Sequence, residues 1–391
     1  MSDSNNKSAS MQMWTDAIGR MLERIEDTRK RVGNEYPHWA NPETGTWTTT
    51  VDGDWTGGFW AGMHWLAAKH TGNDHYHAQA AALAQGLKNR VGVDTVFKSF
   101  PLYYGAALGS ILYEDKSAKD LALSGARSLT SMYNPALALI PLGSQAEEGG
   151  HIGNIETSID SLQAAPFLFW AARVSADDRM RAIAYRHAAT IIPLHQRGDD
   201  SFIQSSTLDE KGKLVRHYTH KGYSATSTWG RAQAWGILFS TMSYLAAPKE
   251  SSWLHAAQRG AQWWIVHVPK DHVAFWDFDD PAIPNTERDT AATAIASSAL
   301  LKLSRAVQDP ASRSRYQRVA ESTITALVRN YLTPTSAQDK RIPGIFTESC
   351  FNKRPDARPH DAANKCEFIV GDYYLLECLL VLAGDVDPVA L

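Results

Sequence analysis

The sequence has few cysteines, no long apolar run and no block of charge of one sign. Its cysteines, Cys350, Cys366 and Cys378, are odd in number and are not spaced like zinc ligands. No stretch reaches the roughly 18 apolar residues that a membrane-spanning helix needs, and residues 1–14 lack the apolar centre of a secretory signal. We therefore expect a cytoplasmic protein with reduced cysteines and no membrane partner.

Charge is balanced along the chain. The 39 Lys and Arg residues against 42 Asp and Glu residues give a net charge of −3, without the basic stripe that a nucleic-acid partner normally requires. The 14 histidines are scattered, and no glycine-rich phosphate loop, His-Glu-x-x-His pattern or Ser-His-Asp order is present. The sequence thus predicts no nucleic-acid partner, no metal and no cofactor.

Tryptophan is unusually abundant. The chain has 13 Trp against 12 Phe and 14 Tyr, although tryptophan is normally the rarest of the three. Some of these side chains must belong to the core, because an indole carries a large apolar surface. An indole beside polar groups is also a surface on which a sugar ring stacks, so a carbohydrate site is the second interpretation.

Nearly every clear segment has a helical period. For example, Trp253, Ala257, Gly260, Ala261 and Trp264 recur at three- and four-residue steps. Helices are expected near residues 10–32, 57–70, 74–92, 100–115, 118–132, 157–175, 178–196, 226–247, 251–268, 289–306, 312–331 and 371–383. These are about twelve helices in pairs, at roughly 60 residues per pair, which is typical of a helical array.

The array can be an open solenoid or a closed ring of hairpins. Residues 291–303 are apolar nearly all round and suit an inner layer, whereas residues 178–195 are more charged and suit an outer layer. We expect an all-α closed ring, a toroid of helical hairpins. No linker divides residues 1–391, so one domain is expected, with a disordered arm at about residues 1–10. The irregular segment 333–365 is either functional or mobile.

The first of three polar and aromatic stretches runs from Asp54 to Trp60, where a helix is expected to begin. Asp54 is interpreted as a helix cap and Trp60 as a core residue. Trp55, which lies beside this cap and a glycine pair, is the expected ligand contact.

The second stretch runs from Ser227 to Trp235. Trp229, Arg231, Gln233 and Trp235 fall on neighbouring rows of one helix, with small residues between them. An arginine suits a planar carboxylate, which it can hold through two hydrogen bonds. The alternative is a structural arginine paired with a buried acid.

The third stretch places Asp160 in the first turn of an apolar helix that continues to Trp170. An aspartate there is commonly only a favourable partner of the helix dipole. From the residues alone, that interpretation and a chemical role for Asp160 stay equally open.

These stretches, in this order, resemble the unsaturated glucuronyl hydrolases, glycoside hydrolase family 88, from about Trp14 to Leu382. The matching motifs start at Asp54, Ile159, Ser227, Phe275, Arg288 and Gly371. The resemblance implies an (α/α)6 barrel that acts on acidic oligosaccharides left by polysaccharide lyases. It implies that Asp160 protonates C4 of the unsaturated uronic acid and then helps water to add at C5. It also implies a monomer or homodimer.

The resemblance further implies which side chains line the sugar subsite. They are Trp55, His220, Trp229, Arg231, Gln233 and Trp235.

The chain departs from the family pattern at a second aspartate. The matching position is Lys98, or Ser99 if the alignment slips by one, and two family tryptophans appear as Leu142 and Val370. A lysine beside Asp160 would hold that carboxylate ionised, or would bind an anionic group of the substrate. Other acids could supply the missing charge: Asp94, Glu147, Glu148 or Glu156. Two alternatives therefore stay open, a lyase, dehydratase or epimerase on uronic acid sugars, and a non-catalytic carbohydrate-binding protein.

Overall fold

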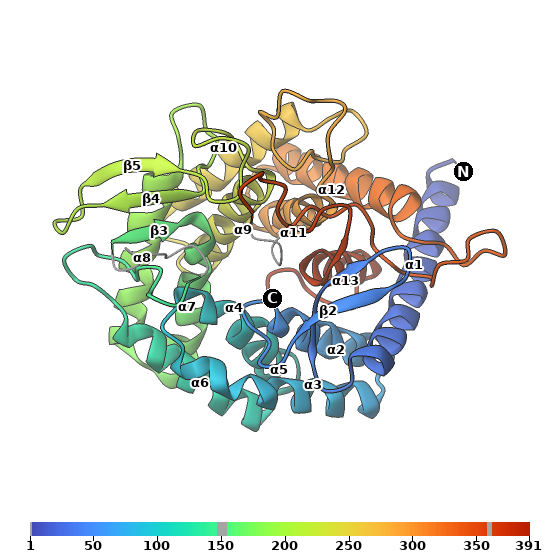
Figure 1. Cartoon of the computed structure of the whole chain (residues 1–391), viewed down its shortest axis with the longest axis horizontal. Coiled ribbons are helices and arrows are strands. Elements are labelled where there is room, and N and C mark those ends of the chain that lie inside the picture. Colours follow the sequence, from blue (N-terminus) through green and yellow to red (C-terminus); the bar gives the residue numbers. More distant parts are fainter. Residues whose placement is uncertain (1, 147–154, 358–361) are drawn as a thin grey trace.

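The structure, a computed structural model, describes residues 2–146, 155–357 and 362–391. Within them, inner helices alternate along the chain with outer helices and form a ring (Figure 1). The inner layer consists of α2 (Gly57–Thr71), α4 (Ser99–Leu102) continued by the π-helix η3 (Tyr103–Ala107) and α5 (Leu108–Tyr113), α7 (Ala164–Ser175), α9 (Gly230–Ala246), α11 (Thr290–Ala306) and α13 (Ile369–Ala383).

The outer layer consists of α1 (Ser2–Val32), α3 (Asp74–Gly86), α6 (Lys116–Ser131), α8 (Asp178–His195), α10 (Ser251–His267) and α12 (Pro310–Asn330). The ring closes because α13 packs against α11 on one side and against α2 and α1 on the other. The closed helical ring that the sequence predicts is therefore confirmed.

The two layers follow from the distribution of apolar residues. In α9 every residue from Gly230 to Ser243 is buried, whereas α12 buries one stripe that includes Tyr316, Ala320 and Leu327. Asp309 caps α12 by accepting hydrogen bonds from the backbone N–H groups of Ala311 and Ser312, and Pro310 begins the helix. None of the helices in the described ranges combines the length and apolar character needed to cross a bilayer.

The predicted helices match the observed ones with three main differences. Helix α1 begins at Ser2, so the arm that was expected to be disordered is part of this helix. The segment 74–92 ends as a 3-10 helix, η1 (Leu87–Gly92). The segment expected as a helix from residue 157 starts with strand β3 (Glu156–Ser158) and the 3-10 helix η4 (Ile159–Gln163), and α7 follows.

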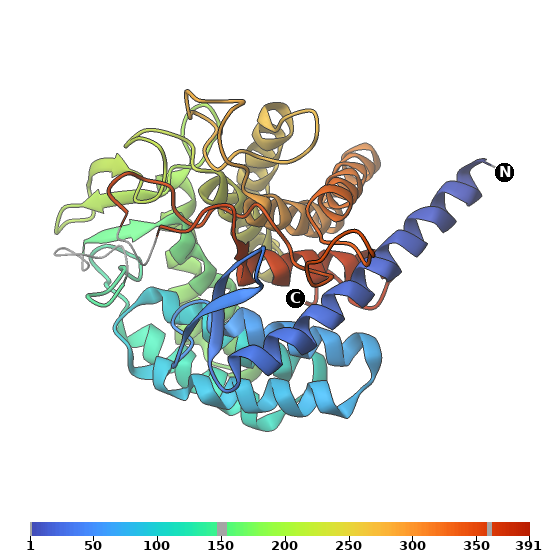
Figure 2. The ribbon, with the colours of Figure 1, turned by 45° about the vertical axis from the view of Figure 1, so that its right-hand side comes forward.

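Two small antiparallel sheets lie on the ring (Figures 1 and 2). One has the order β2-β1-β6, built from Thr46–Thr50, Tyr36–Asn41 and Glu367–Phe368. The other has the order β3-β4-β5, in which β4 spans Ser205–Leu208 and β5 spans Leu214–Tyr218. In the second sheet Ser158 is paired with Ser205, so the strand that leads into Asp160 has a fixed register.

Candidate active site

Asp160 lies in η4, directly before the inner helix α7, and is partly exposed. Its neighbours on both sides are anchored. The N–H of Ile159 donates to the carbonyl of Gln204 at 2.8 Å, and the carbonyl of Ser161 accepts from Nε2 of His187 at 2.8 Å. The carboxylate is therefore presented from a backbone segment that is held on either side.

The tautomer of His187 follows from its two contacts. Nδ1 accepts from the N–H of Ile140 at 3.0 Å, so Nε2 carries the proton that is donated to Ser161. Burial lowers the pKa of His187 to about 4, which keeps the imidazole neutral in this arrangement at neutral pH.

Asp160 faces a narrow cavity of about 20 Å³, which holds about one water molecule. Its walls come from segments that precede or begin inner helices and from the loop before α9. The described residues that line it are Trp55, Phe97, Phe100, Asp160, Lys221, Trp229, Arg231 and Trp235. Of these, Trp55 and Asp160 are partly exposed and the rest are buried, so a ligand from solvent first meets these two.

The structure brings together most of the predicted site residues. Trp55, Asp160, Trp229, Arg231 and Trp235 all contribute to this one cavity. They come from segments far apart in the sequence, which is what the resemblance implies and what the residue pattern alone leaves open.

Aromatic rings make the cavity wall rigid. Trp235 stacks on Phe239 with ring centroids 4.9 Å apart and meets Phe100 edge to face at 5.6 Å. Phe100 also meets the ring of Trp55 at 5.7 Å. Part of the tryptophan excess thus serves both as core and as the wall of the cavity.

Arg231 is paired with a buried acid. Its NH1 donates to Asp289 at 3.0 Å and to the carbonyl of Cys350 at 2.6 Å, and its NH2 donates to the carbonyl of Phe351 at 2.5 Å. Burial raises the pKa of the Asp289 carboxyl, and the Arg231 charge opposes this rise. Arg231 is therefore a structural arginine paired with a buried acid, as the alternative interpretation of the sequence expected. Asp289 neutralises its charge, and the carbonyl groups of residues 350 and 351 accept its other hydrogen bonds.

Lys98 does not line the cavity, contrary to the prediction. Its ammonium donates to the carbonyl of Val91 at 3.2 Å and to Oγ of Ser128 at 2.9 Å. Phe97 faces the cavity instead. Both residues lie in a 3-10 helix (Val96–Lys98), in which successive side chains point about 120° apart. An alignment error of one residue therefore assigns the wrong side chain to the cavity.

Gln233, predicted as a sugar contact, does not line the described cavity either. Its Oε1 accepts from the N–H of Phe202 at 2.7 Å, and its Nε2 donates to the carbonyl of Gly260 at 3.0 Å. The side chain is fully buried and joins α9 to α10 and to the segment before β4. His220 likewise is not among the described residues that line the cavity, although its neighbour Lys221 is.

Asp94 and Glu156, two of the acids proposed as replacements for the second aspartate, do not line the described cavity either. Asp94 accepts from the N–H of Ser144 at 2.9 Å, and Glu156 accepts from Oγ1 of Thr207 at 3.3 Å. Glu147 and Glu148 lie outside the described residues.

Lys221, like Phe97 and Phe100, lines the cavity although the sequence analysis did not predict it. Its side chain is 3% exposed, and its ammonium lies 4.1 Å from the ring centroid of Phe351. The turn that carries it is tight. A Cβ at Gly222 would lie 2.9 Å from Oδ2 of the buried Asp277, which accepts from the N–H of Tyr223 at 2.8 Å. The sequence Thr219-His-Lys-Gly gave no signal that the lysine rather than the histidine turns inward.

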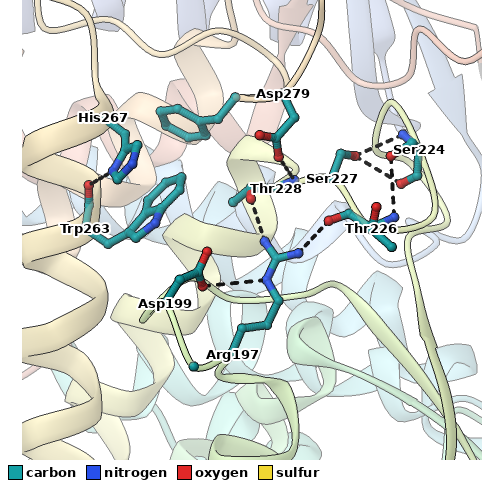
Figure 3. A pocket seen from close by; sticks show the side chains of 11 residues that line it. Arg197, Asp199, Ser224, Thr226, Ser227, Thr228, Trp263, His267 and Asp279 are labelled. Atoms are coloured by element: carbon teal, nitrogen blue, oxygen red, sulfur yellow. Dashed lines mark hydrogen bonds and ion pairs between the residues drawn. The ribbon is translucent and has the colours of Figure 1, made fainter.

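A larger cavity of about 640 Å³ lies between α10 and the loops around residues 198, 226 and 279 (Figure 3). Its lining groups are engaged with one another. His267 stacks on Trp263 at 3.9 Å, Phe278 meets the same indole edge to face at 5.0 Å, and Arg197 donates to the carbonyl of Thr226 at 2.6 Å. None of the predicted site residues lines it, so the Asp160 cavity is the candidate active site.

Comparison with known proteins shows which family the chain belongs to. No family model matches the chain. The chain is 32% identical over 383 residues to the unsaturated glucuronyl hydrolase of Bacillus sp. (strain GL1), covering 95% of this chain and 97% of that protein. The chain belongs to the unsaturated glucuronyl hydrolase family.

A solved structure of the Bacillus enzyme and one further relative extend this result. The crystal structure of the unsaturated glucuronyl hydrolase from Bacillus sp. GL1 superposes with a TM-score of 0.86 at 30% identity, covering 94% of this chain and 96% of that one. An unsaturated chondroitin disaccharide hydrolase of Streptococcus pyogenes serotype M1 is 28% identical over 96% of this chain and 92% of its own length. The fold is the (α/α)6 barrel of this family.

Proposed function

We propose that this protein is a glycoside hydrolase that removes a terminal 4,5-unsaturated uronic acid from oligosaccharides produced by polysaccharide lyases. The observation that carries the proposal is Asp160, the acid among the described residues that line the cavity, together with membership of the family. The names of the relatives, a glucuronyl hydrolase and a chondroitin disaccharide hydrolase, support an acidic sugar as substrate.

The chemistry needs one group that can both give and take a proton. Protonated Asp160 donates its proton to C4 of the C4=C5 double bond, and positive charge develops at C5 and the ring oxygen. A water molecule adds at C5 while the Asp160 carboxylate takes its proton. The resulting hemiketal opens to a ketone, and the hemiacetal formed at C1 releases the rest of the oligosaccharide.

This route suits a site with one acid. Most glycosidases place two carboxyl groups about 5 to 9.5 Å apart across the glycosidic bond. The described lining contains Asp160 and no second carboxylate. Hydration of the double bond does not attack the anomeric carbon, so it does not require the second group.

The partly exposed indole of Trp55 is proposed as the surface on which the sugar ring stacks. The free space beside Asp160 is far smaller than a pyranose ring. The pyranose ring therefore enters beside Trp55 and Asp160. Either it displaces side chains of the cavity wall, or part of the sugar stays at the cavity mouth. Trp229 and Trp235 are proposed to bound its inner edge.

We propose a cytoplasmic location and a single catalytic domain. The three cysteines are free and buried, which suits a reducing compartment, and the ring uses helices from α1 to α13 for its closure. The oligomeric state, a monomer or a homodimer, remains a prediction.

The test follows the ultraviolet absorbance of the double bond, which is conjugated with the C6 carboxyl group. Unsaturated disaccharides from lyase digestion of chondroitin and other uronic-acid polysaccharides are incubated with the protein. We expect the absorbance to fall with release of the second sugar. A rise in absorbance on a saturated polysaccharide would instead support a lyase, and binding without any change would support a carbohydrate-binding protein.

A further inference from the structure

Trp39 lies at the same end of the ring as Asp160. It belongs to β1, which pairs with β6, and β6 leads directly into the inner helix α13. Asp160 likewise follows β3 and directly precedes the inner helix α7. Both residues are therefore placed where inner helices begin, which is where the cavity lies. Trp39 is not among the described residues that line the cavity, but its side chain is partly exposed.

The face of the β2-β1-β6 sheet that carries Trp39 is turned toward the cavity wall. Residues directly opposite one another on antiparallel strands share a face, and Trp39 is opposite Phe368 of β6. The ring of Phe368 meets that of Trp55, which lines the cavity, edge to face at 6.1 Å. Trp47, which is opposite the next residue of β1, lies on the other face and donates from Nε1 to Thr28 of α1 at 3.1 Å.

Two stacking contacts join Trp39 to the cavity. The ring of Trp39 stacks on Phe351 with centroids 5.0 Å apart and planes at 28°. Phe351 in turn stacks against Trp55 with centroids 6.4 Å apart and planes at 24°. Phe351 is 1% exposed, whereas both tryptophans are partly exposed. Trp39 is thus an accessible indole two ring contacts away from the indole that lines the cavity beside Asp160.

The rest of the substrate has to lie outside the cavity. Asp160 must reach C4 of the terminal unsaturated sugar, and the free space beside this carboxylate is about 20 Å³. The saccharide linked at C1 of that sugar is the part that the reaction releases, so it extends from the cavity toward solvent. A sugar ring has an apolar face of C–H groups that stacks on an indole. Trp39 offers such a surface a short distance beyond Trp55.

We propose that Trp39 is a substrate-positioning residue on which the released saccharide stacks. This assignment rests on the proposed function, because it takes the sugar beside Asp160 to be the unsaturated uronic acid. The stacked saccharide takes no part in the protonation of C4, so the contact is the same in the ground state and the transition state. Its loss should therefore raise KM and leave kcat nearly unchanged.

The experiment compares two substrates that differ only in the group released. One is an unsaturated tetrasaccharide from lyase digestion of chondroitin, and the other is the methyl glycoside of the same unsaturated uronic acid. Both carry the conjugated double bond, so both are followed by absorbance. In Trp39→Leu the ratio of kcat/KM for tetrasaccharide over methyl glycoside should fall by about 3- to 10-fold, the size of one aromatic stacking contact, through KM. Trp39→Tyr should restore much of the ratio.

Trp47→Leu is the matched control, because Trp47 is a partly exposed tryptophan of the same sheet whose side chain lies on the opposite face. It should leave the ratio unchanged. Trp39→Met, which keeps an apolar contact with Phe351, serves as a second variant, and thermal unfolding checks that the variants are folded. An equal loss on the two substrates in a folded variant would show that Trp39 only supports Phe351 and would overturn the assignment.

Calorimetric titration separates this assignment from the proposed function. The tetrasaccharide and the methyl glycoside are titrated into proteins with Trp39 and with Trp39→Leu, each also carrying Asp160→Asn so that neither ligand is consumed. If the wild type shows no turnover but the tetrasaccharide alone binds more weakly to the Trp39→Leu protein, the reaction is wrong and the stacking contact stands. If turnover is seen and the tetrasaccharide binds equally well to both proteins, the reaction stands and the contact is wrong.

Discussion

Gln204 holds Lys221 in place, because its Oε1 accepts the backbone N–H of Lys221 at 2.9 Å. The backbone carbonyl of the same glutamine accepts the N–H of Ile159, the residue before Asp160. Gln204 is fully buried and lies directly before β4. One residue thus connects the segment that carries the proposed acid with the loop that carries Lys221, which lines the same cavity.

Replacing Gln204 should therefore impair activity as well as stability. Gln204→Leu removes the acceptor of two backbone N–H groups, those of His220 and Lys221. Unsatisfied buried donors cost about 1–3 kcal/mol each, so the free energy of unfolding should fall by a few kcal/mol. We also expect kcat/KM on the unsaturated disaccharide to fall at least about tenfold, because displacement of a site residue by about 1 Å is costly. Urea unfolding and the absorbance assay measure the two effects.

Gln233→Leu is the control for that variant. Gln233 is also fully buried and its side chain also bridges backbone groups, those of Phe202 and Gly260, but it does not bond the loop of Lys221 or the segment of Asp160. We expect a similar loss of stability and little change in kcat/KM. If Gln233→Leu impaired activity as much as Gln204→Leu, the link through Gln204 would have no special role.

The pair of Arg231 and Asp289 should be a large contributor to stability. Arg231→Met leaves the fully buried carboxylate of Asp289 without its counter-charge, which costs about 3–5 kcal/mol. The double variant Arg231→Met, Asp289→Asn removes the charge and keeps a side chain that can cap α11 through Ala292. It should regain a large part of the loss in urea unfolding. A double variant no more stable than Arg231→Met would contradict this account of the pair.

Stability should fall below neutral pH because buried histidines resist protonation. The pKa of His187 is about 4 in the folded protein, whereas an imidazole in the unfolded chain titrates near 6.5. As the pH falls from 6.5 toward 4, the unfolded state binds a proton that the folded state does not, so the unfolded state is favoured. Burial acts in the same direction on His64, with a pKa of about 4, and on His195, with a pKa of about 3.

The contribution of His187 can be isolated by urea unfolding at pH 7 and pH 5. Between these values the wild-type protein should lose about 2 kcal/mol more than His187→Gln, in which no group titrates at this position. If the free energy of unfolding fell equally in the two proteins, His187 would take up its proton in the folded state between pH 7 and pH 5.

The helical ring is predictable from the sequence because its signal is long and repeated. Segments such as Thr290–Ala306 are buried almost throughout, and segments such as Pro310–Asn330 have one apolar stripe, so the layer of each helix follows from its own residues. The short strands carry no such signal. Glu156–Ser158 is three residues long, and its pairing with β4 depends on a partner about 50 residues away.

The site was predictable at the level of segments but not of side-chain direction. Motif position identifies the turn around Lys98, yet only the fold shows that Phe97 faces the cavity. The same holds at the Thr219-His-Lys-Gly turn, where Lys221 lines the cavity and His220 does not. For Arg231, the sequence gives the residue type, but its partner Asp289 is 58 residues away and becomes visible only in the packed structure.

The most direct test of the central claim is the activity of Asp160→Asn on an unsaturated uronyl disaccharide. Asparagine has nearly the same shape but cannot give or take the proton, so kcat should fall by at least about 100-fold. The midpoint of thermal unfolding and the dissociation constant for the disaccharide should change little. Asp94→Asn, an acid outside the cavity, should keep its activity. An Asp160→Asn protein that retains kcat within tenfold of the wild type would show that Asp160 is not the acting group.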